Sequence, residues 1–148
     1  MRVMCNMEFT LDRMKHSLGV ANAMYGVVRA NPEAYSVSAE DAFTLGFVHD
    51  IGYRFDTDGT HHALVGGLLL KNQGYKYWRE VYYHGIAQSE WESSLLWLLN
   101  YVDMGIGPDG EPMSLEDRLD DMAARFGKGS PQFRVASDMY RVLKSRFM

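Results

Sequence analysis

Residues 42–52 read AFTLGFVHDIG, an apolar run that ends in a histidine, an aspartate and a glycine. Just before this run, Ser38 is followed three residues later by Asp41, a spacing typical of a capping box that starts a helix. The pattern predicts a helix that continues to Val48 and places His49 and Asp50 at its C-terminal end. A histidine-aspartate pair alone is a weak signal, so its meaning depends on the other histidines and aspartates of the chain.

Helical spacing of apolar residues continues on both sides of this stretch. Upstream, intervals of three and four predict a helix from about Leu11 to Arg29, which Asn31-Pro32 ends because proline disfavours a helical residue before it. Downstream, caps and glycines predict five more helices: Thr60 to about Asn72, Tyr75 to His84, Glu90 to Met104, and one each from Ser114 and from Ser130-Pro131. No alternating strand pattern interrupts them. We expect an all-α, single-domain helical bundle of six to seven helices over residues 1–148, with residues 1–8 as an N-terminal extension.

Composition excludes several classes of protein. The chain has 148 residues, 47% of them hydrophobic, which suits one domain with its own core. A single cysteine, Cys5, excludes an internal disulfide framework. The formal charge of -4, without a basic block, disfavours long nucleic acid as a partner. Apolar runs fall short of the roughly 18 residues that a membrane span needs, and the N-terminus lacks a signal peptide's apolar stretch. We expect a cytoplasmic protein that does not enter a membrane.

Nearly all the histidines, together with two aspartates, occur at intervals that could bring them to one place. The set is His16, His49, Asp50, His62, His84 and Asp103. Neutral imidazole and ionised carboxylate suit Fe, Mn, Co, Ni or Zn without any thiolate. Six ligands are too many for a single open catalytic ion, which usually takes about three from the protein. A site for two divalent transition metal ions is therefore predicted, with His61 as an alternative to its neighbour His62.

These residues carry a resemblance to a known family. His16, the His49-Asp50 pair and Asp103 resemble the H, HD and D elements of the HD-domain metal-dependent phosphohydrolase superfamily, and residues 49–52 match the HDIG form of its central motif. Residues 13–20 resemble the first helix of small bacterial HD proteins. Tyr53 stands where many HDIG proteins have lysine.

The resemblance extends to the two remaining histidines. His62 followed by Gly66, and the Tyr83-His84 pair, resemble the extra histidines of the subgroup that holds two metals, and Gly66 favours His62 over His61. The family thus implies that one ion is held by His16, His49, Asp50 and Asp103, and the second by Asp50, His62 and His84. It also implies a helical fold and hydrolysis of phosphate esters by a metal-activated water.

The expected substrate is a small phosphoester, such as a nucleotide. Arg13 lies one turn before His16, and Arg54 follows the HDIG segment, so both are candidates to hold a substrate phosphate in a forked contact. With the shared ligand Asp50, they form the predicted catalytic set. Two alternatives stay open. The same ligand order resembles the di-iron oxygenases of the superfamily, and the chain could also be a nucleotide-binding module that does not turn over.

Overall fold

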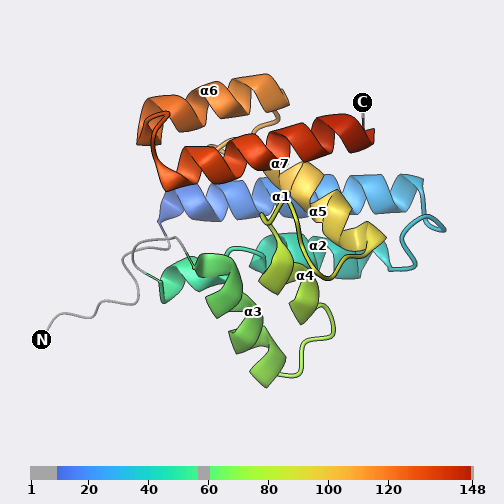
Figure 1. Cartoon of the computed structure of the whole chain (residues 1–148). Coiled ribbons are helices and arrows are strands. Elements are labelled where there is room, and N and C mark those ends of the chain that lie inside the picture. The colour runs from blue at the N-terminus through green and yellow to red at the C-terminus, as the bar shows by residue number, and fades with distance from the viewer. Residues whose placement is uncertain (1–9, 57–60, 148) are drawn as a thin grey trace, which may run out of the picture.

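Seven α-helices and one short 3-10 helix make up the computed structural model, which describes residues 10–56 and 61–147 (Figure 1). In chain order they are α1 (Leu11–Ala30), α2 (Ala39–Val48), η1 (Ile51–Arg54), α3 (His62–Asn72), α4 (Trp78–Tyr83), α5 (Ser94–Met104), α6 (Leu115–Phe126) and α7 (Pro131–Phe147). The described ranges contain no β-strand, only an isolated antiparallel bridge between Ile106 and Pro112. The prediction of an all-α bundle is confirmed.

Side-chain caps fix where several helices begin. The Ser38 hydroxyl accepts a hydrogen bond from the backbone N–H of Asp41 at 3.0 Å, and Ser114 caps α6 through the N–H of Asp117 at the same distance. Such a bond satisfies one of the backbone donors that a helix leaves open at its start. Both predicted starts are confirmed, while the predicted cap Thr60 lies outside the described residues.

Two helices are shorter than the sequence predicts. The helix expected over 90–104 begins only at Ser94, because the Ser93 hydroxyl caps it by accepting from the N–H of Leu96 at 2.9 Å. The helix expected over 75–84 is limited to α4, because the backbone of Tyr75 still bonds to Leu70 in the turn that ends α3. Apolar spacing alone did not reveal these turns, which are set by local hydrogen bonds.

The main core lies among α1, α2, α4 and α5. Its fully buried members include Met24 of α1, Leu45 of α2 and Leu99 of α5. The first two helices approach closely, since a Cβ added at Gly46 would lie 2.8 Å from the backbone of Ala21. This packing brings the C-terminal end of α2 against the first half of α1.

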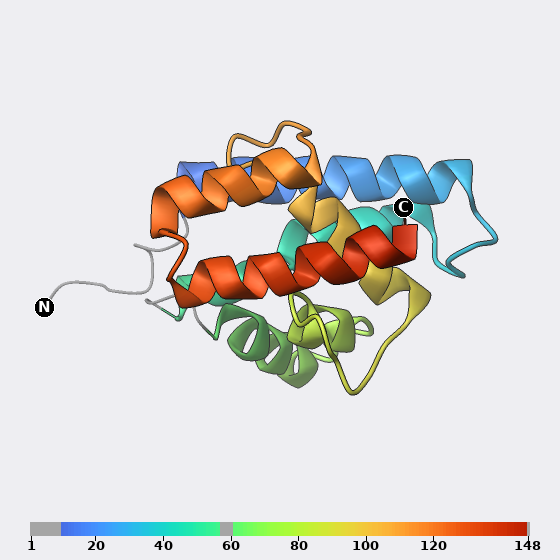
Figure 2. The same ribbon diagram turned by 45° about the horizontal axis from the view of Figure 1, so that its top comes forward.

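The last two helices form a hairpin, and they lie side by side in both views (Figures 1 and 2). A second core cluster joins this hairpin to α5, through Trp97, Met104, Leu115, Met139 and Leu143. Across the described ranges, every helix is too short or too polar to cross a membrane.

Candidate metal centre

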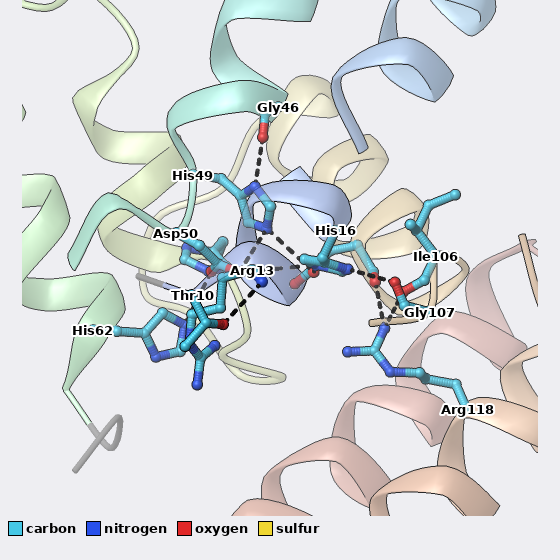
Figure 3. A network of polar contacts seen from close by, with 12 residues as sticks. Thr10, Arg13, His16, Gly46, His49, Asp50, His62, Ile106, Gly107 and Arg118 are labelled. Carbon is cyan, nitrogen blue, oxygen red and sulfur yellow. Dashed lines mark hydrogen bonds and ion pairs between the residues drawn. The ribbon is translucent and has the colours of Figure 1, made fainter. Parts of the chain in front are cut away.

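Six predicted site residues meet at one place in the fold. They come from five parts of the chain: His16 from α1, His49 and Asp50 from the end of α2, His62 from the start of α3, His84 from the end of α4, and Asp103 from α5. Figure 3 shows the side chains of His16, His49 and Asp50 directed toward one another. Residues separated by up to 87 positions are thus neighbours.

Local backbone geometry explains how adjacent residues face one centre. His49, which follows the last residue of α2, still has α-helical dihedral angles, whereas Asp50 has φ -102° and ψ 17° and leads into η1. The expected helix end therefore lies at this pair. Close packing brings His62 to the same place, because a Cβ added at Gly52 would lie only 1.8 Å from the carbonyl oxygen of His62. Only a glycine at position 52 permits this approach of α3.

The six side chains form two groups that could each hold a metal ion. The first group contains His16, His49, Asp50 and Asp103, and the second contains Asp50, His62 and His84. In each group the ligand atoms lie within 4.8 Å of one another. His61 belongs to neither group; it precedes α3, and its backbone N–H donates to a carboxylate oxygen of Asp56 at 2.5 Å.

Asp50 connects the two groups through its two carboxylate oxygens. Its Oδ2 lies 3.3 Å from Nε2 of His49, on the side of the first group. Its Oδ1 lies 3.4 Å from Nε2 of His62 and 3.3 Å from Nε2 of His84. Asp103 completes the first group, with its Oδ1 2.8 Å from Nε2 of His16 and 3.2 Å from Nε2 of His49. One carboxylate therefore belongs to both groups.

Backbone carbonyl groups orient three of the imidazoles. Nδ1 of His49 lies 2.6 Å from the carbonyl oxygen of Gly46, and Nδ1 of His84 lies 2.6 Å from that of Val81. Nδ1 of His16 lies 3.2 Å from the carbonyl oxygen of Gly107. Since a carbonyl can only accept, each Nδ1 donates, which leaves Nε2 as the ring atom that faces the carboxylates and could bind an ion. Ligand histidines of metal sites are commonly held in this way.

The electrostatics of the cluster favour positive charge within it. Burial lowers the pKa of His49, but the charges of Asp50 and Asp103 outweigh this effect and hold that pKa well above its usual range. Burial raises the pKa of each aspartate, yet the charge of His49 and hydrogen bonds from the surrounding imidazoles hold both pKa values well below their usual range. Both carboxylates thus stay ionised, and a divalent cation would balance their charge. The donor set fits such an ion.

An arginine that the sequence did not single out supports this centre from α6. Nη1 of Arg118 donates to the carbonyl oxygen of Asp103 at 2.8 Å and also to that of Ile106 (Figure 3). The next residue, Gly107, supplies the carbonyl that orients His16. Arg118 therefore fixes the end of α5 and the following loop, on which two ligands of the first group depend.

A cavity of about 660 Å³ opens beside the cluster. Arg13 lines it, with its guanidinium 3.2 Å from the centre of the Tyr53 ring, and this ring stacks on His62 at 4.0 Å. Burial, with the nearby charge of Asp50, raises the pKa of the Tyr53 hydroxyl, so this group stays protonated at neutral pH. Arg54, at the end of η1, is not among the residues that line the cavity. The structure thus brings only one of the two predicted arginines to the site.

Sequence reasoning also passed over Asn100 as a site residue. This side chain is 2% exposed, lines the cavity, and its Oδ1 accepts a hydrogen bond from the N–H of Gly85 at 2.8 Å, next to His84. Asn100 lies three residues before Asp103, so both occupy one face of α5. That spacing was the available signal for Asn100. Nothing near Arg118 in the sequence gave a comparable signal.

Comparisons with protein-family models, curated proteins and solved structures found no match for this chain. The functional interpretation therefore depends on the geometry of the site. That geometry is a helical fold that buries a cluster of four imidazoles and two carboxylates able to bind metal.

Proposed function

We propose that this protein is a metal-dependent phosphohydrolase that uses two divalent ions to cleave small phosphate esters. The observation that carries the proposal is the position of Asp50, whose two oxygens face separate groups of imidazoles. A carboxylate shared in this way is the usual bridge of a two-metal site, and such sites are common among phosphatases.

The ligand count supports the same chemistry. The first group offers four side chains and the second offers three, including the shared aspartate, which leaves coordination positions open. Two divalent ions held here would lower the pKa of water and stabilise the charge that develops on a transferring phosphoryl group. Hydrolysis then forms a bond from the water oxygen to phosphorus and breaks the ester P–O bond, and the released oxygen takes a proton from that water.

The chain's own residues supply positive charge for an anionic substrate. Arg13 reaches the cavity and is held against the ring of Tyr53, which leaves the edge of its guanidinium as the donor surface for phosphate oxygens. Arg118 and Arg125 also line the cavity, but Arg118 donates to backbone carbonyls and Arg125 pairs with Asp121. The positive charge of Arg13 beside the cluster therefore favours a phosphorylated ligand over a neutral one.

The direct test is phosphate release by the purified chain loaded with Mn, Fe, Co, Ni or Zn, from a panel of phosphomonoesters and nucleotides under anaerobic conditions. We expect phosphate release that chelation abolishes. Asp50→Ala should lose both metal and turnover, whereas Asp138→Ala, on α7 and not among the residues that line the cavity, should keep both.

Other outcomes would overturn the proposal. Full metal occupancy with undiminished phosphate release in Asp50→Ala would refute the assigned role of that carboxylate. Substrate-dependent oxygen uptake by the iron-loaded protein, without phosphate release, would identify an oxygenase. A nucleotide that binds tightly and is never converted would identify a binding module.

A further inference from the structure

The cavity beside the metal cluster has a second, chemically different end. Away from the imidazoles and carboxylates it is lined mainly by apolar side chains of α5, α6 and α7, with Gln132, Arg118 and Arg125 beside them; the apolar ones are Met104, Met122, Phe126, Val135, Ala136 and Met139. The last two helices, which supply five of these six, lie side by side as a hairpin (Figure 2). One continuous cavity therefore joins a polar, charged end to an apolar end.

The apolar end has a buried floor, formed by Met104 and Met139 of the second core cluster, and a rim that is open to solvent. Phe126 is 41% exposed and Val135 is 54% exposed, although both belong to helices whose other apolar faces are buried. Three of the six side chains are methionines, which adapt their shape to an apolar group better than branched residues do. These side chains form a wall that an apolar ligand could cover.

The size of the cavity exceeds what a phosphate group needs. A volume of about 660 Å³ lies in the range that proteins use for organic ligands of moderate size. The arginines at this end already have partners: Arg118 donates to backbone carbonyls, and Arg125 pairs with Asp121 at 3.0 Å. A sugar or polyol placed here would bury hydroxyl groups against methionine and phenylalanine, which is unfavourable without hydrogen bonds.

We infer that the substrate is a phosphomonoester of a bulky, apolar alcohol, whose phosphate binds at the metal cluster while its hydrocarbon part lies against Met122, Phe126 and Met139. The inference rests on the proposed hydrolase function and adds the class of substrate. Hydrolysis of such an ester yields inorganic phosphate and an apolar alcohol, with water as the only co-reactant.

The test compares propyl phosphate with hexyl phosphate on the metal-loaded protein. Each fully buried methylene contributes about 0.8 kcal/mol, or about fourfold, so three of them give about sixtyfold in kcat/KM; because part of the wall is exposed to solvent, we expect at least about tenfold. Phe126→Ser should reduce this ratio several-fold. The matched control is Phe147→Ser, since Phe147 is 40% exposed, lies on the same hairpin and is not among the cavity's lining residues. Because the measured quantity is a ratio, loss of folded protein does not alter it.

A second measurement separates this inference from the hydrolase proposal. Hexylphosphonate and propylphosphonate cannot be hydrolysed at their P–C bond, and their binding to the metal-loaded protein can be followed by calorimetry. We expect at least about tenfold tighter binding of hexylphosphonate, reduced in Phe126→Ser and retained in Phe147→Ser. Tighter binding of hexylphosphonate without any phosphate release from the esters would refute the hydrolase proposal but support the apolar subsite. Equal kcat/KM for the two esters, equal binding of the two phosphonates, or equal loss in both variants would overturn the inference.

Discussion

Gly52→Ala adds one methyl group at the position where α3 packs against η1, and it should move the second group of candidate ligands away from the first. An alanine Cβ there would lie 1.8 Å from the carbonyl oxygen of His62, whereas ordinary contact begins at 3.4 Å. The first turn of α3 must therefore move by about 1.6 Å. His62 Nε2 now lies 3.4 Å from Asp50, and metal ligands tolerate errors of only about 0.2 Å.

The consequences of Gly52→Ala follow from that displacement. Overpacking of this kind costs about 1 to 3 kcal/mol in the free energy of unfolding. The second group of ligands loses His62, while His16, His49 and Asp103 of the first group are on other elements. We expect the variant to remain helical, to unfold more easily, and to bind one metal ion fewer per chain.

Elemental analysis of the metal-loaded variant and urea unfolding in EDTA measure these two effects. Gly26→Ala is the control, since no atom lies within 4 Å of a Cβ added at Gly26 and the residue is inside α1. This control should gain up to about 1 kcal/mol from helix propensity and keep its metal. Wild-type metal content and stability in Gly52→Ala would refute the reasoning.

Three further predictions concern charge and metal. Arg118→Leu removes the donor to two backbone carbonyls and should lower the free energy of unfolding by about 1 to 3 kcal/mol, whereas Arg141→Leu, at an exposed position, should change it little; urea titrations measure both. In the metal-free protein in EDTA, the raised pKa of His49 stabilises the folded state below pH 6.5, and this stabilisation is lost as the pH rises through the folded-state pKa of His49. The lowered pKa values of Asp50 and Asp103 stabilise the folded state above pH 3.8, and that stabilisation is lost as the pH falls through the folded-state pKa values of the two aspartates. A metal-free stability that increased from pH 6.5 to alkaline pH would contradict this. Chelation should lower Tm, and re-addition of Mn should restore it, because an ion that binds only the folded state stabilises it; a Tm that EDTA leaves unchanged would count against a bound ion.

Local patterns in the sequence predicted much of the fold. Apolar spacing located the helices, and serine caps gave correct starts at Ser38 and Ser114 because capping depends on residues three positions apart. The predicted starts of α4 and α5 were wrong because hydrogen bonds in the turns before these helices override the apolar pattern. Propensity contains no information about such competition.

The candidate site, too, was predicted from the sequence only in part. His49 and Asp50 were expected at a helix end and are found there, and the other four residues join them, although metal binding itself stays a prediction. Arg118 and the apolar end of the cavity could not be foreseen, because both depend on how the α6–α7 hairpin packs against α5. Packing between distant helices is not encoded in any local spacing.

The most direct test of the account is the number of divalent ions that one chain binds at saturation, measured by elemental analysis of the wild type and of His62→Ala. The account predicts two ions for the wild type and one for the variant. A wild type that binds no ion, or a variant that binds as many as the wild type, would contradict it.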